Sequence, residues 1–263
     1  MATDTVTWWG HATVGLEVAG VRLLTDPLLR ANVAFLRWAN AAPPRGLAGR
    51  TDAVLVSHPH RDHLDLPSLA MFAPGTRFLV PRGSGRLVRR VARGPVTELD
   101  VGDTVDVGGV EVRATFAAHD GRRGAGRTPE RTVGPALGYV VSGGSTVYFA
   151  GDTDLFPGMA DLAAHLDVAV LPVGGWGPTL GPGHLDPERA ARALTLLRPR
   201  RAIPVHWGSL RVPGFWRVRP GRQTNAGAAF RTHARALAPE VDAFVAVPGR
   251  PFAVSGPEII RYG

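Results

Sequence analysis

Val54-Leu55-Val56-Ser57-His58-Pro59-His60-Arg61-Asp62-His63-Leu64-Asp65 is the stretch that decides the fold. It begins as an apolar run typical of a buried strand and ends in three histidines and two carboxylates. Imidazole and carboxylate groups without a thiolate suit Zn²⁺ or a similar first-row divalent cation. A polar loop between a strand and a helix is the alternative. Three of the chain's nine histidines within six positions favour a metal site.

The spacing of these side chains predicts two neighbouring metal positions. His58 and His60 alternate, so both rings can face one point from an extended turn. Asp62 and His63 follow directly and can reach a second point beside the first. We therefore interpret the stretch as half of a two-metal site.

Length and composition are typical of one packed domain. With 263 residues, 44% of them hydrophobic, the chain can bury a large core, and we expect a single domain over residues 1–263. No apolar run approaches the roughly 20 residues that span a bilayer. We see no secretory signal at the N-terminus, so a cytoplasmic location is the default expectation. The absence of cysteine excludes disulfides and thiolate ligands.

The formal charge of +8 ordinarily indicates nucleic acid, anionic lipid or phosphorylated partners. Here every basic residue is arginine, and arginine, alanine, glycine and proline are all plentiful, which indicates a compositional bias. The arginines cluster in residues 82–93, 122–131 and 211–222, which we interpret as solvated faces and loops. We expect a small-molecule or lipid-derived substrate and no nucleic-acid partner. The sequence indicates no oligomeric state.

Hydrophobic periodicity predicts two β-rich halves with interspersed helices. We expect strands over 5–9, 13–18, 21–25, 53–57, 77–80, 97–99, 104–107, 110–116, 136–141, 146–150, 168–173, 202–205 and 242–247, and helices over 67–72, 85–93, 154–166, 187–197 and 225–237. Two sheets packed together with helices outside give an α/β fold, a four-layer αββα sandwich. Residues 28–40 are predicted as a loop or short amphipathic helix that covers the core, or forms a lipid-facing or substrate-capping lip. Residues 120–135 are predicted as a mobile loop at the edge of the site.

Three further ligand candidates follow predicted strands. His119 closes the strand over 110–116, Asp152 follows the strand over 146–150, and His206 follows the strand over 202–205. Taken alone, each residue is better explained as an ordinary core, surface or turn residue. Their common position just after strands favours a shared site at one edge between the sheets.

The order His-x-His-x-Asp-His, His, Gly-Asp-Thr, His resembles the metallo-β-lactamase superfamily over nearly the whole chain. The resemblance implies an αββα fold and a binuclear site, with two divalent ions, Zn²⁺ first and Mn²⁺ as the alternative. By motif, His58, His60 and His119 would hold the first metal, Asp62, His63 and His206 would hold the second, and Asp152 would bridge them.

Three more motifs narrow the resemblance to one branch. They are Trp8-Trp9-Gly10-His11-Ala12-Thr13, Leu24-Thr25-Asp26-Pro27 and Gly183-His184-Leu185-Asp186-Pro187-Glu188. That branch contains the bacterial ascorbate-phosphate lactonases and the N-acyl-phosphatidylethanolamine phospholipase D type enzymes. The phospholipase type is the closer match, because Pro172-Val173-Gly174-Gly175 and His206-Trp207-Gly208 occur in the same order.

These observations predict a metal-dependent hydrolase that uses water activated by two cations on a phosphodiester or lactone. The catalytic side chains are predicted to be Asp62, Asp152 and His184, with His184 binding the substrate or protonating the leaving group. The rival functions are a metallo-nuclease on the same site, a mononuclear-iron dioxygenase acting on a thiol, and a non-catalytic metal scaffold.

The remaining motif residues have two readings each. His11 contacts the site or orients it, and Asp26 accepts a hydrogen bond from a ligand imidazole or is a turn residue. Asp186 before Pro187 is predicted as a helix N-cap. Specificity is predicted in residues 28–44, 121–135 and 207–223. Trp207, Phe215 and Trp216 would line an apolar pocket there or pack beneath the loop.

Overall fold

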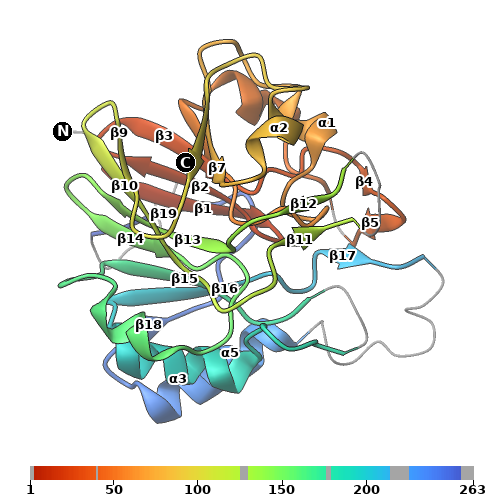
Figure 1. Cartoon of the computed structure of the whole chain (residues 1–263). Coiled ribbons are helices and arrows are strands. Elements are labelled where there is room, and N and C mark those ends of the chain that lie inside the picture. Colours follow the sequence, from red (N-terminus) through yellow and green to blue (C-terminus); the bar gives the residue numbers. More distant parts are fainter. Residues whose placement is uncertain (1–2, 40, 125–129, 176–178, 214–224, 256–263) are drawn as a thin grey trace.

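Two seven-stranded sheets form the centre of the molecule (Figure 1). The computed structural model describes residues 3–39, 41–124, 130–175, 179–213 and 225–255. The first sheet has the order β19 (Pro251–Ala253), β1 (Thr5–Gly10), β2 (Thr13–Val18), β3 (Val21–Thr25), β6 (Ala53–Leu55), β7 (Arg77–Pro81) and β8 (Val96–Leu99). The second has the order β18 (Asp242–Ala243), β16 (Arg201–Val205), β15 (Val168–Pro172), β14 (Thr146–Phe149), β13 (Leu137–Ser142), β10 (Val110–Phe116) and β9 (Thr104–Val107).

Each sheet combines an antiparallel meander with parallel strands. In the first sheet β3, β6, β7 and β8 are parallel, and in the second β14, β15, β16 and β18 are parallel. Among the parallel strands, β6 and β15 are apolar throughout and every one of their residues is buried, since both of their faces are covered. β1 instead alternates between buried and half-buried residues, as a strand with one covered face does.

Apolar side chains fill the space between the sheets and beneath the helices. Val14 and Leu16 of the first sheet and Tyr139 and Phe149 of the second belong to one buried cluster. A second cluster lies under α3 (Pro187–Leu197) and α5 (Ala226–Leu237), and a third lies under α1 (Leu66–Leu69) and α2 (Gly85–Val88). The helices thus cover the outer faces of both sheets (Figure 1), which confirms the αββα sandwich.

Short strands gather at one edge of the sandwich (Figure 1). β4 (Asn32–Val33) and β5 (Leu36–Trp38) form a hairpin that pairs with β17 (Leu210–Arg211), and β11 (Arg122–Arg123) pairs with β12 (Thr132–Val133). The hairpin corrects the prediction of a loop or helix over 28–40. The cause is non-local, because β17 and Leu210 come from the far end of the chain and complete the small core around Leu28 and Trp38.

Two other predicted elements are wrong. Residues 154–166 contain only the 3₁₀ turn Pro157–Asp161, since Pro157 and Gly158 are poor helix formers and the regularly spaced apolar residues are buried by turns instead. The predicted terminal strand over 242–247 is reduced to β18. The chain then crosses to the first sheet, where β19 pairs with β1.

A second 3₁₀ helix spans Arg45–Gly49. Among the described residues, no helix is long and apolar enough to cross a membrane.

Candidate metal centre

The predicted ligands lie at strand ends along one edge of the two sheets. His58 follows β6, His119 follows β10, Asp152 follows β14 and His206 follows β16. His206 has φ +62° and its amide donates to the carbonyl of His11 at 3.0 Å, which ties the second sheet to the β1–β2 turn. The structure therefore brings all of the predicted ligands into one region.

Three imidazoles form the first group. His58 Nε2 lies 2.9 Å from His60 Nδ1, and His119 Nε2 lies 3.2 Å from the same atom. His58 is fully buried, whereas His60 and His119 are half-buried at the mouth of the site. These three rings can offer three nitrogens to one cation.

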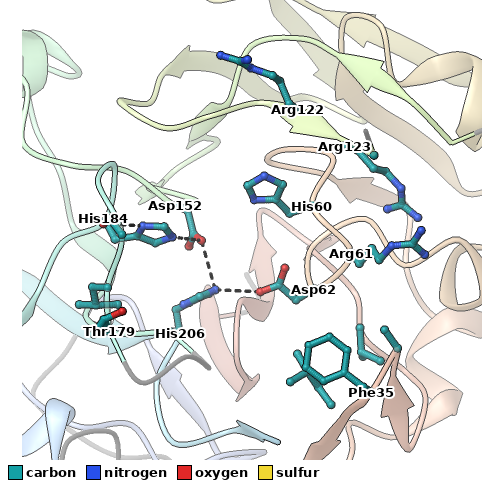
Figure 2. Close-up of a pocket in the computed structure, with 17 residues that line it drawn as sticks. Phe35, His60, Arg61, Asp62, Arg122, Arg123, Asp152, Thr179, His184 and His206 are labelled. Atoms are coloured by element: carbon teal, nitrogen blue, oxygen red, sulfur yellow. Dashed lines mark hydrogen bonds and ion pairs between the residues drawn. The ribbon is translucent and has the colours of Figure 1, made fainter. Parts of the chain in front are cut away.

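Two imidazoles and two carboxylates form the second group. His63 Nε2 lies 3.0 Å from His206 Nε2, and both nitrogens lie 3.6 Å from Asp62 Oδ2. Asp152 Oδ2 lies 3.3 Å from His63 Nε2 and 3.4 Å from His206 Nε2. Figure 2 shows His206 between these two carboxylates.

Asp152 belongs to more than one potential ligand group. It lies with His58 and His63, and also with His119 and His184, within ligand reach of a single ion. Its second oxygen, Oδ1, is buried and has no hydrogen-bond partner among the described residues. A buried carboxylate oxygen without a donor is costly, and a cation is the simplest partner that removes the cost.

The hydrogen bonds on the outer ring nitrogens show how a cation fits. His206 Nδ1 donates to Gly174 O at 3.0 Å, and His63 Nδ1 donates to Asp26 Oδ2 at 2.8 Å. A neutral imidazole carries one N–H, so both Nε2 atoms then present lone pairs to each other at 3.0 Å. Two facing lone pairs repel, and a proton or metal ion between them is required.

The same reasoning applies to the first group. His119 Nδ1 donates to Gly183 O at 2.8 Å, which leaves Nε2 as an acceptor. The Ser57 hydroxyl donates to Asp26 Oδ2 at 2.6 Å and therefore accepts from His58 Nδ1 at 3.0 Å. His58 Nε2 then also presents a lone pair to the site. Both groups therefore offer the donor atoms that a divalent metal ion needs.

Burial and neighbouring charges shift the pKa values of the site's histidines in opposite directions. Burial lowers the pKa of His58 well below its ordinary value and lowers that of His119 to about 4. Burial also opposes charge on His63, but the carboxylates of Asp152, Asp62 and Asp26 outweigh it and raise the pKa of His63 well above its usual range. The raised pKa of His63 means that a proton competes with a metal ion for the space between the two facing rings.

Partners behind the ligands hold them in place. Asp26, at φ +35°, is fully buried and accepts hydrogen bonds from Ser57 N at 2.7 Å and from the His63 ring. Of its two predicted roles, it therefore has that of acceptor for a ligand imidazole. His11 Nε2 lies 3.0 Å from Asp62 Oδ2, and the His11 amide donates to Ser209 Oγ at 2.7 Å. Burial lowers the pKa of His11 to about 4.

His184 lies beside the second carboxylate. Its Nε2 is 3.5 Å from Asp152 Oδ2, and its ring meets that of His119 edge to face at 4.7 Å. The hydrogen bond with Asp152 raises the pKa of His184, so the ring holds a proton more readily than a free histidine. Asp186, two residues on, accepts from Arg189 N at 2.8 Å and caps α3 as predicted.

A cavity of about 580 Å³ opens beside these residues (Figure 2). Its lining comes from the ligands, the β4–β5 hairpin, β11 and the loop before α3: Val33, Ala34, Phe35, Leu36, His60, Arg61, Asp62, Arg122, Arg123, Gly124, Asp152, Gly175, Thr179, Leu180, Gly181, His184 and His206. The predicted specificity segments 28–44 and 121–135 both contribute to it.

Some contacts were not predicted from sequence. Ser57 links Asp26 to His58, Ser209 supports His11, and Arg123 is buried against the histidine loop. No local pattern marks these contacts, since each residue also binds a partner that is distant in sequence: Asp26 for Ser57, His11 for Ser209 and Pro59 for Arg123. Trp207 stacks on Trp8 with ring centroids 5.6 Å apart, whereas Phe215 and Trp216 lie outside the described residues.

Comparison with known proteins agrees with this geometry. Residues 21–207 match the family model for the beta-lactamase superfamily domain. A UPF0173 metal-dependent hydrolase of Nitratidesulfovibrio vulgaris is 34% identical over 220 residues, which cover 79% of this chain and 81% of the relative.

Solved structures share the fold. Igni18, a metallo hydrolase from Ignicoccus hospitalis, has a TM-score of 0.71 at 23% identity and covers 95% of this chain and 98% of its own. CmlA, a diiron β-hydroxylase from Streptomyces venezuelae, has a TM-score of 0.69 at 19% identity over 96% of this chain and 54% of its own. The chain therefore belongs to the metallo-β-lactamase superfamily, and its relatives place it among the metal-dependent hydrolases of that family.

Proposed function

We propose that the protein hydrolyses a small phosphodiester or lactone with two bound divalent cations, Zn²⁺ first and Mn²⁺ as the alternative. One observation carries the proposal: the Nε2 atoms of His63 and His206 face each other at 3.0 Å, beside an oxygen of Asp152 that has no hydrogen-bond partner in the described part of the chain. This donor set contains only imidazole and carboxylate groups, which suit these ions. His58, His60 and His119 would hold one ion, Asp62, His63 and His206 the other, and Asp152 would bridge them.

Bound cations of this kind lower the pKa of water toward neutrality and polarise a carbonyl or phosphoryl oxygen. The side chains around the ligands keep these ligands in position. Asp62 is held by His11 at 3.0 Å, and Asp26 orients the His63 ring, so neither ligand has to reorganise during the reaction.

His184 is the proposed proton donor to the leaving group. Its Nε2 lies at the cavity wall beside Asp152, and Asp152 raises its pKa. Its Nδ1 faces the carbonyls of Gly181 at 3.1 Å and Pro182 at 3.2 Å, which fix the ring. A proton held on Nε2 therefore lies on the side of the ring that faces Asp152, at the wall of the cavity that a substrate would occupy.

The cavity lining supports a substrate with an apolar part. Val33, Phe35 and Leu36 of the β4–β5 hairpin form one apolar stretch of the wall, and the Phe35 side chain is 60% exposed. The hairpin is braced by its own core and by Trp38 Nε1, which donates to Arg30 O at 2.7 Å. We propose that this wall contacts an acyl, alkyl or aryl group of the substrate.

The basic residues of the cavity favour a small substrate over a nucleic acid. Arg61 pairs with Glu130 at 2.7 Å, and Arg122 pairs with Asp120 at 3.1 Å. These carboxylates offset the positive charge that a polyanion would need along its backbone. We therefore propose no nucleic-acid partner, and a cytoplasmic single-domain enzyme stays the working expectation.

The test is a substrate screen with the metal-loaded protein. Aryl phosphodiesters, lactones of increasing chain length and oligonucleotides are incubated with Zn²⁺- or Mn²⁺-loaded protein, with a chelated sample beside each. We expect metal-dependent turnover of a phosphodiester or lactone that improves with apolar size. Turnover only of oligonucleotides, or no turnover with two metals bound, would overturn the proposal.

A variant of the apolar wall adds a specific check. In the wild type, kcat/KM should rise roughly fourfold for each methylene added to the substrate, since each buried methylene contributes about 0.8 kcal/mol. Phe35→Ser should reduce this increase, because the contact with the apolar wall is lost. Phe116 is 48% exposed and does not line the cavity, so Phe116→Ser is the matched control. Equal slopes in the two variants would exclude the proposed contact.

A further inference from the structure

Arg123 is a buried cation at the back of the ligand loop. It lies on β11, and its side chain is only 5% exposed. Its Nη1 donates to two backbone carbonyls, that of Pro59 at 3.0 Å and that of Leu64 at 2.7 Å. A single nitrogen therefore contacts two points of the histidine loop that are five residues apart in sequence.

The two carbonyls enclose the segment that carries His60, Asp62 and His63. Inside it, His60 O accepts from His63 N at 3.1 Å and from Leu64 N at 2.7 Å. Those bonds form a tight turn but do not anchor it to the rest of the molecule. Arg123 ties the backbone of this turn to β11, in addition to the side-chain contacts of Asp62 with His11 and of His63 with Asp26.

The opposite side of the guanidinium is bound to Glu130. Arg123 Nε and Nη2 lie 3.3 Å and 3.0 Å from Glu130 Oε2, and Arg61 of the loop lies 2.7 Å from the same oxygen. The β11–β12 hairpin is itself docked, since Thr132 Oγ1 donates to Gly83 O. The planar guanidinium thus spans a carboxylate and two carbonyls at once, which an ammonium group cannot match.

We propose that Arg123 is a positioning residue for the metal centre, which sets metal affinity by holding the loop that carries His60, Asp62 and His63. It belongs to neither ligand group, although it also lines the cavity. Glu130 acts through it by neutralising and orienting the guanidinium. This inference rests on the metal centre of the proposed function but not on the reaction, and it gives Arg123 and Glu130 a role in holding the ligand loop.

The experiment measures metal binding and folding separately. Arg123→Met, Arg123→Lys and the wild type are titrated with Zn²⁺, melted with and without metal, and loaded with Co²⁺ to compare the visible absorption of the bound ion. Arg201→Met is the matched control. Arg201 is also buried, and it binds Ala253 O at 2.6 Å and Asp242 at 3.0 Å away from the cavity lining.

We expect Arg123→Met to weaken Zn²⁺ binding about 10- to 100-fold, the usual effect of losing a partner behind metal ligands, and to alter the Co²⁺ spectrum. Arg123→Lys should recover part of the affinity, because it restores a charge and a donor. Arg201→Met should lower the melting temperature of the metal-free protein and leave metal affinity unchanged.

A second variant keeps the test decisive if Arg123→Met does not fold. Glu130→Gln preserves size and should weaken Zn²⁺ binding about fivefold, since a charged hydrogen bond becomes a neutral one. Wild-type affinity and spectrum in Arg123→Met or Glu130→Gln would overturn the inference alone. A wild type that binds no metal would overturn the proposed function as well.

Discussion

Replacing Asp26 with asparagine tests how the second metal position is built. The carboxylate accepts three hydrogen bonds, from Ser57 N at 2.7 Å, Ser57 Oγ at 2.6 Å and His63 Nδ1 at 2.8 Å. An amide has a single acceptor oxygen, so its NH₂ group must face either Ser57 N–H or the pair formed by the hydroxyl and the ring.

The arrangement that keeps the Ser57 N–H bond turns the NH₂ group toward His63. The ring must then carry its proton on Nε2, which removes the nitrogen that faces His206 at 3.0 Å. Losing such a partner costs about 10- to 100-fold in metal affinity, equal to about 1.4–2.7 kcal/mol. If the ring keeps its tautomer, a buried donor stays unpaired and the folded protein loses about 1–3 kcal/mol instead.

Zn²⁺ titration of the purified protein, with a melting curve of the metal-free form, measures both effects. Asp167→Asn is the matched control, because Asp167 also accepts from a backbone amide (Thr146 N, 2.9 Å) and faces an imidazole (His165 Nε2, 3.1 Å), yet does not line the cavity. Wild-type metal affinity and stability in Asp26→Asn would refute the reasoning. So would an equal loss of affinity in the control.

Three other outcomes follow from the site. His184→Gln should lower kcat by about 10²- to 10⁴-fold, the usual contribution of a general acid, and leave the measured metal content unchanged. A loss of bound metal would identify His184 as a ligand instead. Metal affinity should fall by about tenfold for each pH unit below the raised pKa of His63, because a proton then competes with the metal for the ring. The pKa is raised because the carboxylates of Asp152, Asp62 and Asp26 outweigh the effect of burial. Zn²⁺ titration at several pH values measures this, and an affinity that does not change with pH would contradict it. Asp186→Ala should cost about 1 kcal/mol of stability by removing the cap of α3, with metal affinity unchanged, as chemical denaturation and Zn²⁺ titration would measure.

The sequence predicted the elements whose signal is local. The apolar run before His58 is typical of a buried strand, and β6 confirms that prediction. The start of α3 also has a local signal, because Asp186 caps the helix and Pro187 occupies its first position. The convergence of His119, Asp152 and His206 on the histidine loop followed from their positions after strands, together with the family resemblance.

What the sequence could not predict depends on distant partners. The β4–β5 hairpin needs β17, and β19 needs β1, so neither pairing is visible in a local window. The apolar spacing over 154–166 imitates a helix, although Pro157 and Gly158 oppose one. The sequence indicates only that Arg123 belongs to a basic segment, because its acceptors, Pro59 O and Leu64 O, are backbone atoms about sixty residues earlier.

The central claim is that the two histidine groups hold two metal ions. Anomalous scattering from Zn²⁺-loaded crystals tests it most directly. The account predicts two peaks about 3.5–4 Å apart, one among His58, His60 and His119 and one among Asp62, His63 and His206, with Asp152 between them. A single peak, or peaks away from these side chains, would contradict it.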